Sequence, residues 1–443
     1  MKKIIGIFCF ILLGLCLVSC MEEPPIDKPD QGNTEPPSGG KLPDDGKDDT
    51  PSVDKQPDDE KDDWEKKIVF WHTMGDSLQK VLQDAIDSFE KANEGWEIES
   101  VQFGSMDHIL EETISNSNKP DLVYAFPEQV ARYKEKGLIV DMNHYIEDEN
   151  VGFSKDEVDD FIKAFYEEGK SYGDGAMYSL PFSKASEVLY YYKKEASDYP
   201  KTWEELEAIE DLNHITLRVE SEVLLFTTLA HQSGANYTTL EDNHYVFDNE
   251  INRKNVEMLK RLYNQKKLVT ANTSASSTYN NKYHLASSGA VYRYITLNTF
   301  DELQVAPLPT FRGKARRVPF QGPSLCMVKK QSEKQLKTWE FIRDYLLDSK
   351  FQAKFSMYSL YNPVRKSAYE DEDYLEWLKT EEAIASMINI CKSYEDDYYF
   401  NPPFIGSDNA SKEVGNIIVQ VLLGKKTIDQ AFKDALKNCN SYK

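Results

Sequence analysis

The chain has 443 residues, which is long enough for two domains that each bury a sizeable core. Its formal net charge is −23, and no segment gathers lysine and arginine into a phosphate-binding face, which argues against nucleic acid as a partner. Three of the six cysteines, Cys326, Cys391 and Cys439, lie beyond the N-terminal segment and lack metal-ligand spacing. We expect them to be buried free thiols, and we expect no metal and no cofactor.

The N-terminal residues predict an export signal. Two lysines precede a compact apolar run at 4–17, which leads into Val-Ser-Cys. This order is typical of a secretory signal, and the run is too short to span a membrane comfortably. The ending resembles a bacterial lipobox, which implies removal of residues 1–19 and an anchor in the lipid bilayer through Cys20. The alternative is an ordinary signal peptide that carries an incidental cysteine.

Residues 20–63 form a polar segment that is rich in proline, glycine, aspartate and lysine. It carries 15 acidic and 5 basic side chains. Such a composition buries too little apolar surface to offset the entropy lost on ordering. We therefore expect a disordered, extended acidic linker, which would let the folded body move above the membrane.

Residues 64–183 alternate apolar runs with amphipathic segments. The pattern predicts strands at 67–71, 97–103 and 121–125, and helices at 77–92, at 106–117 and up to Gly137. This order implies a mostly parallel sheet covered by helices, in which ligands bind beyond the carboxyl ends of the strands. The loops at those ends supply six candidate ligand-binding residues, namely His72, Thr73, Asp76, Ser105, Phe126 and Glu128.

Residues 178–193 hold two strand-like runs, at 177–182 and 188–192, joined by a short polar bridge. Because an α/β alternation precedes this stretch and another follows it, we interpret it as an interdomain hinge that lines a cleft. Its bridge residues Ser183, Lys184 and Glu187 are candidate ligand contacts. Glu187 could instead serve only as a hydrogen-bonding group across the hinge.

The second half continues the alternation. It predicts strands at 214–219, 289–294, 303–308 and 324–328, and helices at 223–231, 255–267, 333–347, 408–423 and 427–437. Glu220 and Glu222 lie just before the helix at 223–231, where carboxylates could accept hydrogen bonds from a ligand. Either acid could instead stabilise the helix N-terminus through its dipole.

Six motifs recur in the order seen in the extracellular solute-binding proteins of bacterial carbohydrate ABC transporters. They are Ile-Val-Phe-Trp at 68–71, Pro-Asp-Leu-Val-Tyr at 120–124, Gly-Leu-Ile-Val-Asp at 137–141, Pro-Lys-Thr-Trp-Glu-Glu-Leu at 200–206, Leu-Pro-Thr-Phe-Arg-Gly at 308–313 and Gly-Lys-Lys-Thr-Ile-Asp-Gln-Ala at 424–431. Together they cover nearly the whole body of the chain, which resembles the maltose-binding and glycerol-3-phosphate-binding members of that family.

The resemblance implies a type II periplasmic-binding-protein-like α/β fold, with two lobes joined by hinge strands around a ligand cleft. It makes residues 178–193 the first crossing between lobes and places a second crossing near 317–322. The N-terminal lobe is then expected at 64–183 plus about 290–320, and the C-terminal lobe at 187–289 plus about 324–443.

The resemblance also implies further site residues. Gly322 and Ser324 match a glycine-rich cleft loop, although a tight turn is the alternative. Leu297 stands where relatives often carry a stacking tryptophan, so Tyr294 becomes the candidate for stacking. Ser411 stands where relatives place a tryptophan or an arginine. These departures weaken both maltose and glycerol 3-phosphate as the specific ligand.

The expected function is non-catalytic. A monomer at the extracellular face of the bacterial cytoplasmic membrane would capture a carbohydrate or polyol-phosphate ligand and pass it to ABC permease subunits. The sequence contains no P-loop, no GxSxG and no HExxH motif. Two alternatives stay open at this point, a secreted hydrolase with a pair of carboxylates and a surface receptor without a transport role.

Overall fold

The computed structural model describes residues 65–193, 196–210, 215–238, 245–274, 281–297 and 302–442. The chain divides into an N-terminal unit, Met1–Glu65, and a body, Lys66–Lys443. The expected signal, Cys20 and the acidic linker lie outside the described residues. Within the described ranges, no helix has the length and apolar character needed to cross a membrane.

The first sheet has five strands in the order β2-β1-β3-β11-β4. Their bounds are β1 Lys67–His72, β2 Glu97–Gln102, β3 Leu122–Ala125, β4 Leu180–Pro181 and β11 Ser324–Met327. β1 pairs in parallel with β2 and β3, as the βαβ pattern predicts. β11 comes from far along the chain and pairs antiparallel with both β3 and β4.

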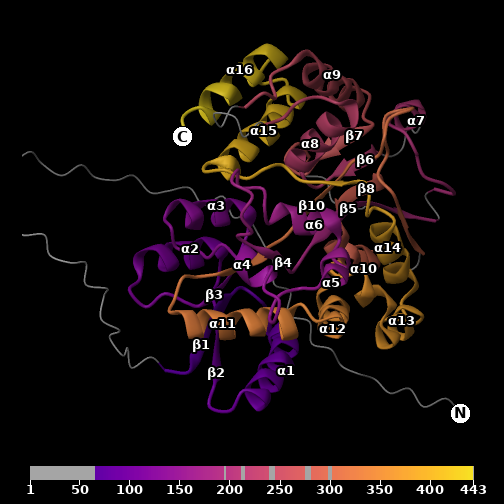
Figure 1. Ribbon diagram of the computed structural model, residues 1–443. Coiled ribbons are helices and arrows are strands. Elements are labelled where there is room, and N and C mark those ends of the chain that lie inside the picture. Colours follow the sequence, from indigo (N-terminus) through magenta and orange to yellow (C-terminus); the bar gives the residue numbers. More distant parts are fainter. Residues whose placement is uncertain are drawn as a thin grey trace, which may run out of the picture. The chain divides into compact units, whose positions relative to one another are not determined.

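Helices cover this sheet because their apolar residues recur at three- and four-residue spacing. In α1, which runs from Asp76 to Ala92, the buried face is formed by Val81, Leu82, Ala85, Ile86 and Phe89. The same lobe contains α2 Met106–Ser115, α3 Pro127–Glu135, α4 Asn143–Ile146, α5 Lys155–Asp159, α6 Lys163–Glu168, α11 Ser332–Phe341 and α12 Ser349–Ser359. A π-helical turn, Ile342–Leu346, follows α11. In Figure 1, α1 and α11 lie beside β1 and β2.

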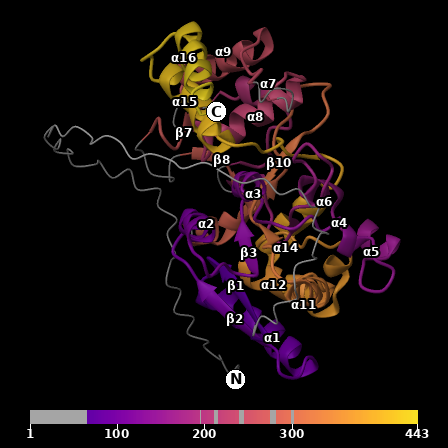
Figure 2. The ribbon, with the colours of Figure 1, turned by 60° about the vertical axis from the view of Figure 1, so that its left-hand side comes forward.

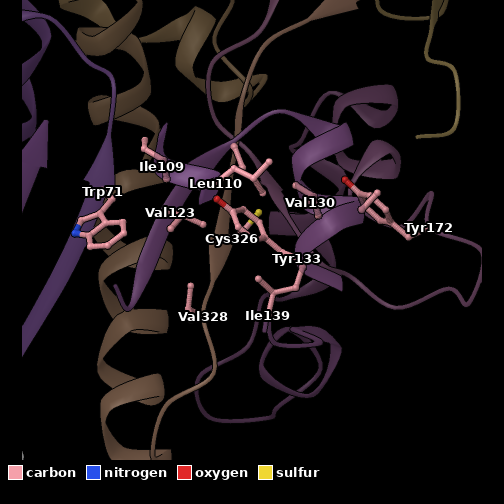
Figure 3. Packing of buried hydrophobic residues seen from close by; sticks show 12 residues of the cluster. Trp71, Ile109, Leu110, Val123, Val130, Tyr133, Ile139, Tyr172, Cys326 and Val328 are labelled. Carbon is pink, nitrogen blue, oxygen red and sulfur yellow. The ribbon is translucent and has the colours of Figure 1, made fainter. Parts of the chain in front are cut away.

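The core of this lobe is built from segments that are distant in the sequence. Figure 3 shows Cys326 of β11 among Val123 of β3, Leu110 of α2 and Tyr133 of α3. Cys326 is a free, buried thiol, as are Cys391 and Cys439, which confirms that expectation for all three. The core therefore requires a strand that arrives after most of the other lobe has been traversed.

The second sheet has seven strands, in the order β12-β10-β5-β8-β6-β7, with β9 paired to β5. Their bounds are β5 Ala185–Tyr192, β6 Ile215–Val219, β7 Leu268–Thr270, β8 Asn281–Ser287, β9 Leu303–Ala306, β10 Val318–Gln321 and β12 Tyr398–Tyr399. β5 is buried along its whole length and pairs antiparallel with β8, β9 and β10. It is the central strand of this lobe.

The helices of the second lobe pack around that sheet. They are α7 Trp203–Ala208, α8 Glu222–Ser233, α9 Glu250–Asn264, α10 Val291–Leu297, α14 Glu382–Lys392, α15 Ser407–Leu422 and α16 Ile428–Cys439, and α13 Glu372–Leu378 lies between α12 and α14. Figures 1 and 2 both show α8, α9, α15 and α16 side by side. Two short 3-10 turns, Ser288–Ala290 and Ser367–Glu370, complete the described elements.

Two predictions about this half of the chain are wrong. The expected strand at 289–294 is a 3-10 turn followed by α10, in which Val291 and Tyr294 are buried one helical turn apart. The segment at 289–294 is apolar enough for a strand or a helix, and the spacing of its apolar residues does not distinguish the two.

The predicted division of the later segments between the lobes is also wrong. The segment at about 290–320 was expected in the N-terminal lobe, yet β9 and β10 pair with β5 in the second sheet. The segment from about 324 was expected in the C-terminal lobe, yet β11 pairs with β3, and α11 and α12 contact β1 and α1. The chain therefore passes from the second lobe back to the first at 322–323, and then returns.

Candidate functional site

The two crossings between the sheets run side by side. The first joins β4 to β5 through residues 182–184, and the second joins β10 to β11 through residues 322–323. Ala185 pairs with Gln321 on one side, and Pro181 pairs with Ser324 on the other. Between them, the buried Ser183 donates its N–H to the carbonyl of Pro323 at 3.2 Å. The chain thus passes between the sheets inside 178–193 and directly after 317–322, the stretches in which the crossings are predicted.

Gly322 allows the two crossings to approach each other. Its φ of +142° lies in the region that L side chains rarely adopt, and a Cβ there would stand 1.9 Å from the carbonyl oxygen of Ser183. Glycine is required because both the backbone conformation and the space exclude a side chain. The glycine predicted to approach a ligand thus approaches the first crossing instead.

Lys184 connects the two crossings through hydrogen bonds that its buried side chain makes. Its side chain is 0% exposed, and Nζ donates to Glu168 Oε2 at 2.5 Å, to the Gly322 carbonyl at 2.7 Å and to Ser324 Oγ at 3.0 Å. An ammonium group has three N–H donors, so all of them are used. Burial raises the pKa of Glu168, and the charge of Lys184 opposes that rise. Lys184 and Ser324 therefore link the two crossings in this structure, and Lys184 has no donor left for a ligand.

Three residues missed by sequence reasoning contact the crossings and the start of β5: Glu168, Asn362 and Tyr398. Asn362 donates its N–H to the carbonyl of Lys184 and its side-chain amide to Ser186 Oγ, each at 2.7 Å. The same hydroxyl lies 2.7 Å from Tyr398 Oη. These partners are far away in the sequence. The one signal in the sequence is the lysine in the short bridge between two apolar runs, which needs an acidic partner once it is buried.

His72 does not face a ligand site. It is buried, its Nδ1 accepts the N–H of Met74 at 3.1 Å, and its Nε2 lies 2.7 Å from Ser100 Oγ. Because Nδ1 accepts, the ring proton resides on Nε2 and is donated to the serine. Burial lowers the pKa of His72 to about 4. The ring is neutral and both nitrogens are satisfied, so the predicted role in ligand binding is wrong.

The remaining first-lobe candidates lie at the N-termini of helices. Asp76 begins α1, Ser105 caps α2 by accepting the N–H of His108 at 3.2 Å, and Phe126 caps α3 with its N–H on Gln129 Oε1 at 3.0 Å. Thr73 is half-buried, with Oγ1 3.8 Å from Met106 Sδ. Because β1, β2 and β3 are parallel, these positions share the edge of the sheet at which the strands end.

Glu128 lies in the first turn of α3. Burial raises its pKa to about 7, an effect opposed by a backbone hydrogen bond and reinforced by the negative charges of Asp408, Glu168 and Asp107. Asp408 stands in the first turn of α15, a helix of the other lobe. Ser411 of the same helix has its Oγ 3.5 Å from Tyr237 Oη. Acidic groups of both lobes therefore influence Glu128.

Glu187 stands at the start of β5, opposite Ser287 of β8. It is 3% exposed, and its Oε2 has no hydrogen-bond partner among the described residues. Burial, together with the negative charge of Glu220, raises the pKa of Glu187 to about 8. At neutral pH this carboxyl group is therefore mainly protonated, and it has an unused hydrogen-bonding atom.

Glu220 and Tyr294 lie with Glu187 at this end of the second sheet. Glu220 follows β6 and its Oε1 accepts from Arg218 Nε at 2.9 Å and from Tyr294 Oη at 3.5 Å. The ring of Tyr294 stacks on Tyr190, with centroids 4.4 Å apart. We name this set the β5-end cluster, comprising Glu187, Tyr190, Arg218, Glu220 and Tyr294. It joins three of the predicted site residues.

Glu222 is separate from that cluster. It is buried as the first residue of α8, and its two carboxylate oxygens accept from the N–H and the side-chain amide of Asn272, each at 3.0 Å. It therefore fixes the turn after β7 to the helix N-terminus. Glu222 thus lies at the helix end, where the alternative interpretation places it, and both of its carboxylate oxygens already accept hydrogen bonds within the fold.

No group of three or more His, Cys, Asp or Glu side chains in the described ranges could hold a metal ion. Two α/β sheets joined by adjacent crossings form the fold of type II periplasmic binding proteins. Within that class, the chain belongs to the bacterial extracellular solute-binding protein family, whose sequence model matches residues 84–382.

Individual relatives match only part of the chain, and at low sequence identity. The sn-glycerol-3-phosphate-binding periplasmic protein UgpB of Salmonella typhimurium is 28% identical over 149 residues, covering 31% of this chain and 33% of that protein. The maltotriose-binding protein of Pyrococcus abyssi is 26% identical over 145 residues, covering 32% and 30%. The chain thus matches about a third of the length of these curated relatives.

A solved structure supports the fold over a greater length. The cyclic alpha-maltosyl-1,6-maltose binding protein of Arthrobacter globiformis superimposes with a TM-score of 0.72 at 16% identity, covering 85% of this chain and 98% of that chain. At this identity the likeness establishes the architecture only.

Proposed function

We propose that this protein captures a carbohydrate or a related polyol phosphate outside the cell and delivers it to the permease subunits of an ABC transporter. The observation that carries the proposal is Glu187, a buried carboxyl group just after the first crossing whose Oε2 has no hydrogen-bond partner among the described residues. A buried polar group without a hydrogen bond is costly, so a ligand that supplies the missing partner is stabilised there.

The neighbours of Glu187 suit a ligand with hydroxyl groups. Glu220 is partly exposed and can accept further hydrogen bonds. Tyr190 and Tyr294 are buried and stack on each other, so they support this end of the sheet from the interior. The relatives named above are binding proteins for glycerol 3-phosphate and for maltotriose, and both of these molecules carry hydroxyl groups. Together these features favour binding over catalysis.

The proposed mechanism is closure about the two crossings. A ligand first binds one lobe, and closure then adds contacts from the other, for which Thr73, Asp76, Ser105, Phe126, Glu128 and Ser411 are candidates. The ligand shifts the balance between open and closed forms by its difference in affinity for the two. A monomer held to the bilayer through lipidated Cys20 would present the closed complex to the permease at the outer face of the cytoplasmic membrane.

A thermal-shift screen tests the proposal. The panel contains maltose, maltotriose and glycerol 3-phosphate, and calorimetry follows for each molecule that raises Tm. A true ligand at 100 times its Kd stabilises the fold by about 2.7 kcal/mol. If no sugar and no polyol phosphate raises Tm, the proposed ligand class is wrong. Turnover of a sugar by the purified protein would instead favour a hydrolase.

A further inference from the structure

The residues on either side of each crossing belong to different sheets. Ala185 and Gln321 are paired with each other inside the second sheet. Ser324 is paired with Pro181 inside the first sheet. The side chain of Lys184 holds Gly322 and Ser324 through hydrogen bonds and holds Glu168 through an ion pair. Lys184 is therefore bound to the first lobe, although its own backbone leads directly into the second.

This arrangement leaves very little chain between the two bodies. In the first crossing, the next residue after Lys184 is Ala185, which already belongs to β5. In the second crossing, Gln321 ends β10, and the following residue, Gly322, is held by Lys184. Hinge motions are absorbed by a few backbone dihedral angles at the ends of elements. The available angles lie at 184–185 and at 321–322, which are adjacent across the paired crossings.

We propose that Lys184 is the positioning residue of the hinge, and that its bonds to Glu168, Gly322 and Ser324 confine lobe closure to the 184–185 and 321–322 linkages. By fastening both crossings to the first lobe, Lys184 makes the two linkages bend together about one axis. This inference rests on the proposed function, because the position of the axis matters only if the lobes close on a ligand.

Because the ion pair between Lys184 and Glu168 is buried, the connection that it makes to the crossings is rigid. Lys184 is buried, and its Nζ lies 5.6 Å from the centroid of the Phe320 ring. A charge held away from water keeps its partners closely, because exchange for water is not available to it. Without this connection, residues 182–184 and 322–323 would each gain freedom, and the lobes could adopt a wider range of relative orientations.

Interlobe distances measured by pulsed electron paramagnetic resonance test this inference on the full chain. Spin labels are attached through p-acetylphenylalanine introduced at Lys80 of α1 and Glu257 of α9, two exposed positions in different lobes. This chemistry leaves the native cysteines unlabelled. The test variant combines Lys184→Met with Glu168→Gln, so that no unpaired charge remains in the interior. Maltotriose and glycerol 3-phosphate serve as the probes.

A matched control removes a similar ion pair that lies within one lobe. Lys334 of α11 contacts Asp121 Oδ2 at 3.1 Å, and both residues belong to the first lobe. The control variant combines Lys334→Met with Asp121→Asn. It reports the effect of losing an ion pair without any effect on the crossings.

We expect the Lys184 variant to broaden the free protein's distance distribution about twofold, and the Lys334 control to leave its width unchanged. A Lys184 variant with the wild-type distribution would overturn the inference, as would equal broadening in the control. The proposed function has a separate readout, which is the shift of the wild-type distribution when either probe is added. If the probes shift nothing but the Lys184 variant broadens the distribution, the proposed function fails and the positioning role stands.

Discussion

Two buried acidic groups near the crossings differ in one respect. Glu168 and Glu187 are both almost fully enclosed, but Glu168 has the ammonium group of Lys184 at 2.5 Å, whereas Glu187 has a second carboxylate, Glu220, as its nearest charged influence. The first acid is part of the framework and the second has an unused oxygen. Burial alone therefore does not mark a site residue, because the presence or absence of a partner for the carboxyl group separates the two roles.

The largest effect on stability is expected when Glu168 loses its partner and, like Glu187, becomes a buried carboxyl group without an ion pair. Lys184→Met alone removes the partner and leaves the Glu168 carboxyl group buried and unpaired. Breaking one side of a buried ion pair costs about 3–5 kcal/mol, so we expect a loss of that size in the free energy of unfolding measured with urea. The double variant Lys184→Met with Glu168→Gln should regain much of the loss. A single variant as stable as wild type would contradict the framework role of this pair.

The second prediction concerns the contact that brings the crossings together. Gly322→Ala places a Cβ 1.9 Å from the Ser183 carbonyl, in a conformation unfavourable to alanine. We expect a loss of about 2–4 kcal/mol in urea unfolding, from strain and displaced backbone. Gly289→Ala is a suitable control, since its nearest neighbour to a new Cβ is 3.7 Å away. Equal effects of the two substitutions would contradict the close approach at Gly322.

The third prediction sharpens the role of Glu187. Glu187→Gln keeps the shape but cannot ionise, and we expect about tenfold weaker binding of whichever screened sugar or polyol phosphate binds wild type, which is about 1.4 kcal/mol. Calorimetry at pH 7 measures it. If Kd is unchanged while the fold is intact, Glu187 does not contact the ligand.

The pH dependence of stability offers an independent test at the same residue. The pKa of Glu187 is about 8 in the folded protein and near 4.5 in the unfolded chain, so the folded state keeps a proton that the unfolded state loses. The contribution of Glu187 to stability is therefore fully present below pH 4.5 and is lost as the pH rises to about 8. We expect Glu187→Gln to flatten that decline in urea unfolding curves. A variant with the same decline as wild type would show that Glu187 is not the group responsible.

The smallest effect is expected at Glu222, which resembles Glu187 in residue type and burial but has both oxygens satisfied by Asn272. Glu222→Gln keeps one acceptor and should cost about 1 kcal/mol of stability. Binding of a screened ligand should remain as in wild type when measured by calorimetry. A marked loss of affinity would place Glu222 in the site after all.

The helices and strands were predictable from the sequence because their apolar residues recur at a regular spacing. The alternation of β1, α1, β2, α2, β3 and α3 is visible in the spacing of apolar residues, and each of these segments lies within a few residues of its predicted bounds. Both crossings were predictable as well. The polar bridge of the first crossing interrupts apolar runs, and the resemblance to a known family implies the second.

The partners of the crossings were not predictable in the same way. Lys184 meets Gly322 and Ser324 across a long stretch of chain, and no local pattern encodes that pairing. The lobe membership of residues after 323 depended on the direction in which the second crossing runs, which strand patterns do not reveal. At the candidate site, the sequence identified Glu187, Glu220 and Tyr294, but it also selected His72 and Glu222, whose polar atoms are satisfied internally.

The position of β11 has a consequence for how the protein acquires its fold. β3 gains its second neighbour only when Ser324–Met327 arrives, and β5 likewise needs β8, β9 and β10 from later in the chain. Neither sheet can be completed by a growing chain until synthesis has passed residue 327 for the first sheet and residue 399, the end of β12, for the second. Such non-local pairing raises the contact order and slows folding to about milliseconds to seconds. Both sheets are thus expected to form late and together, around the two crossings that they share.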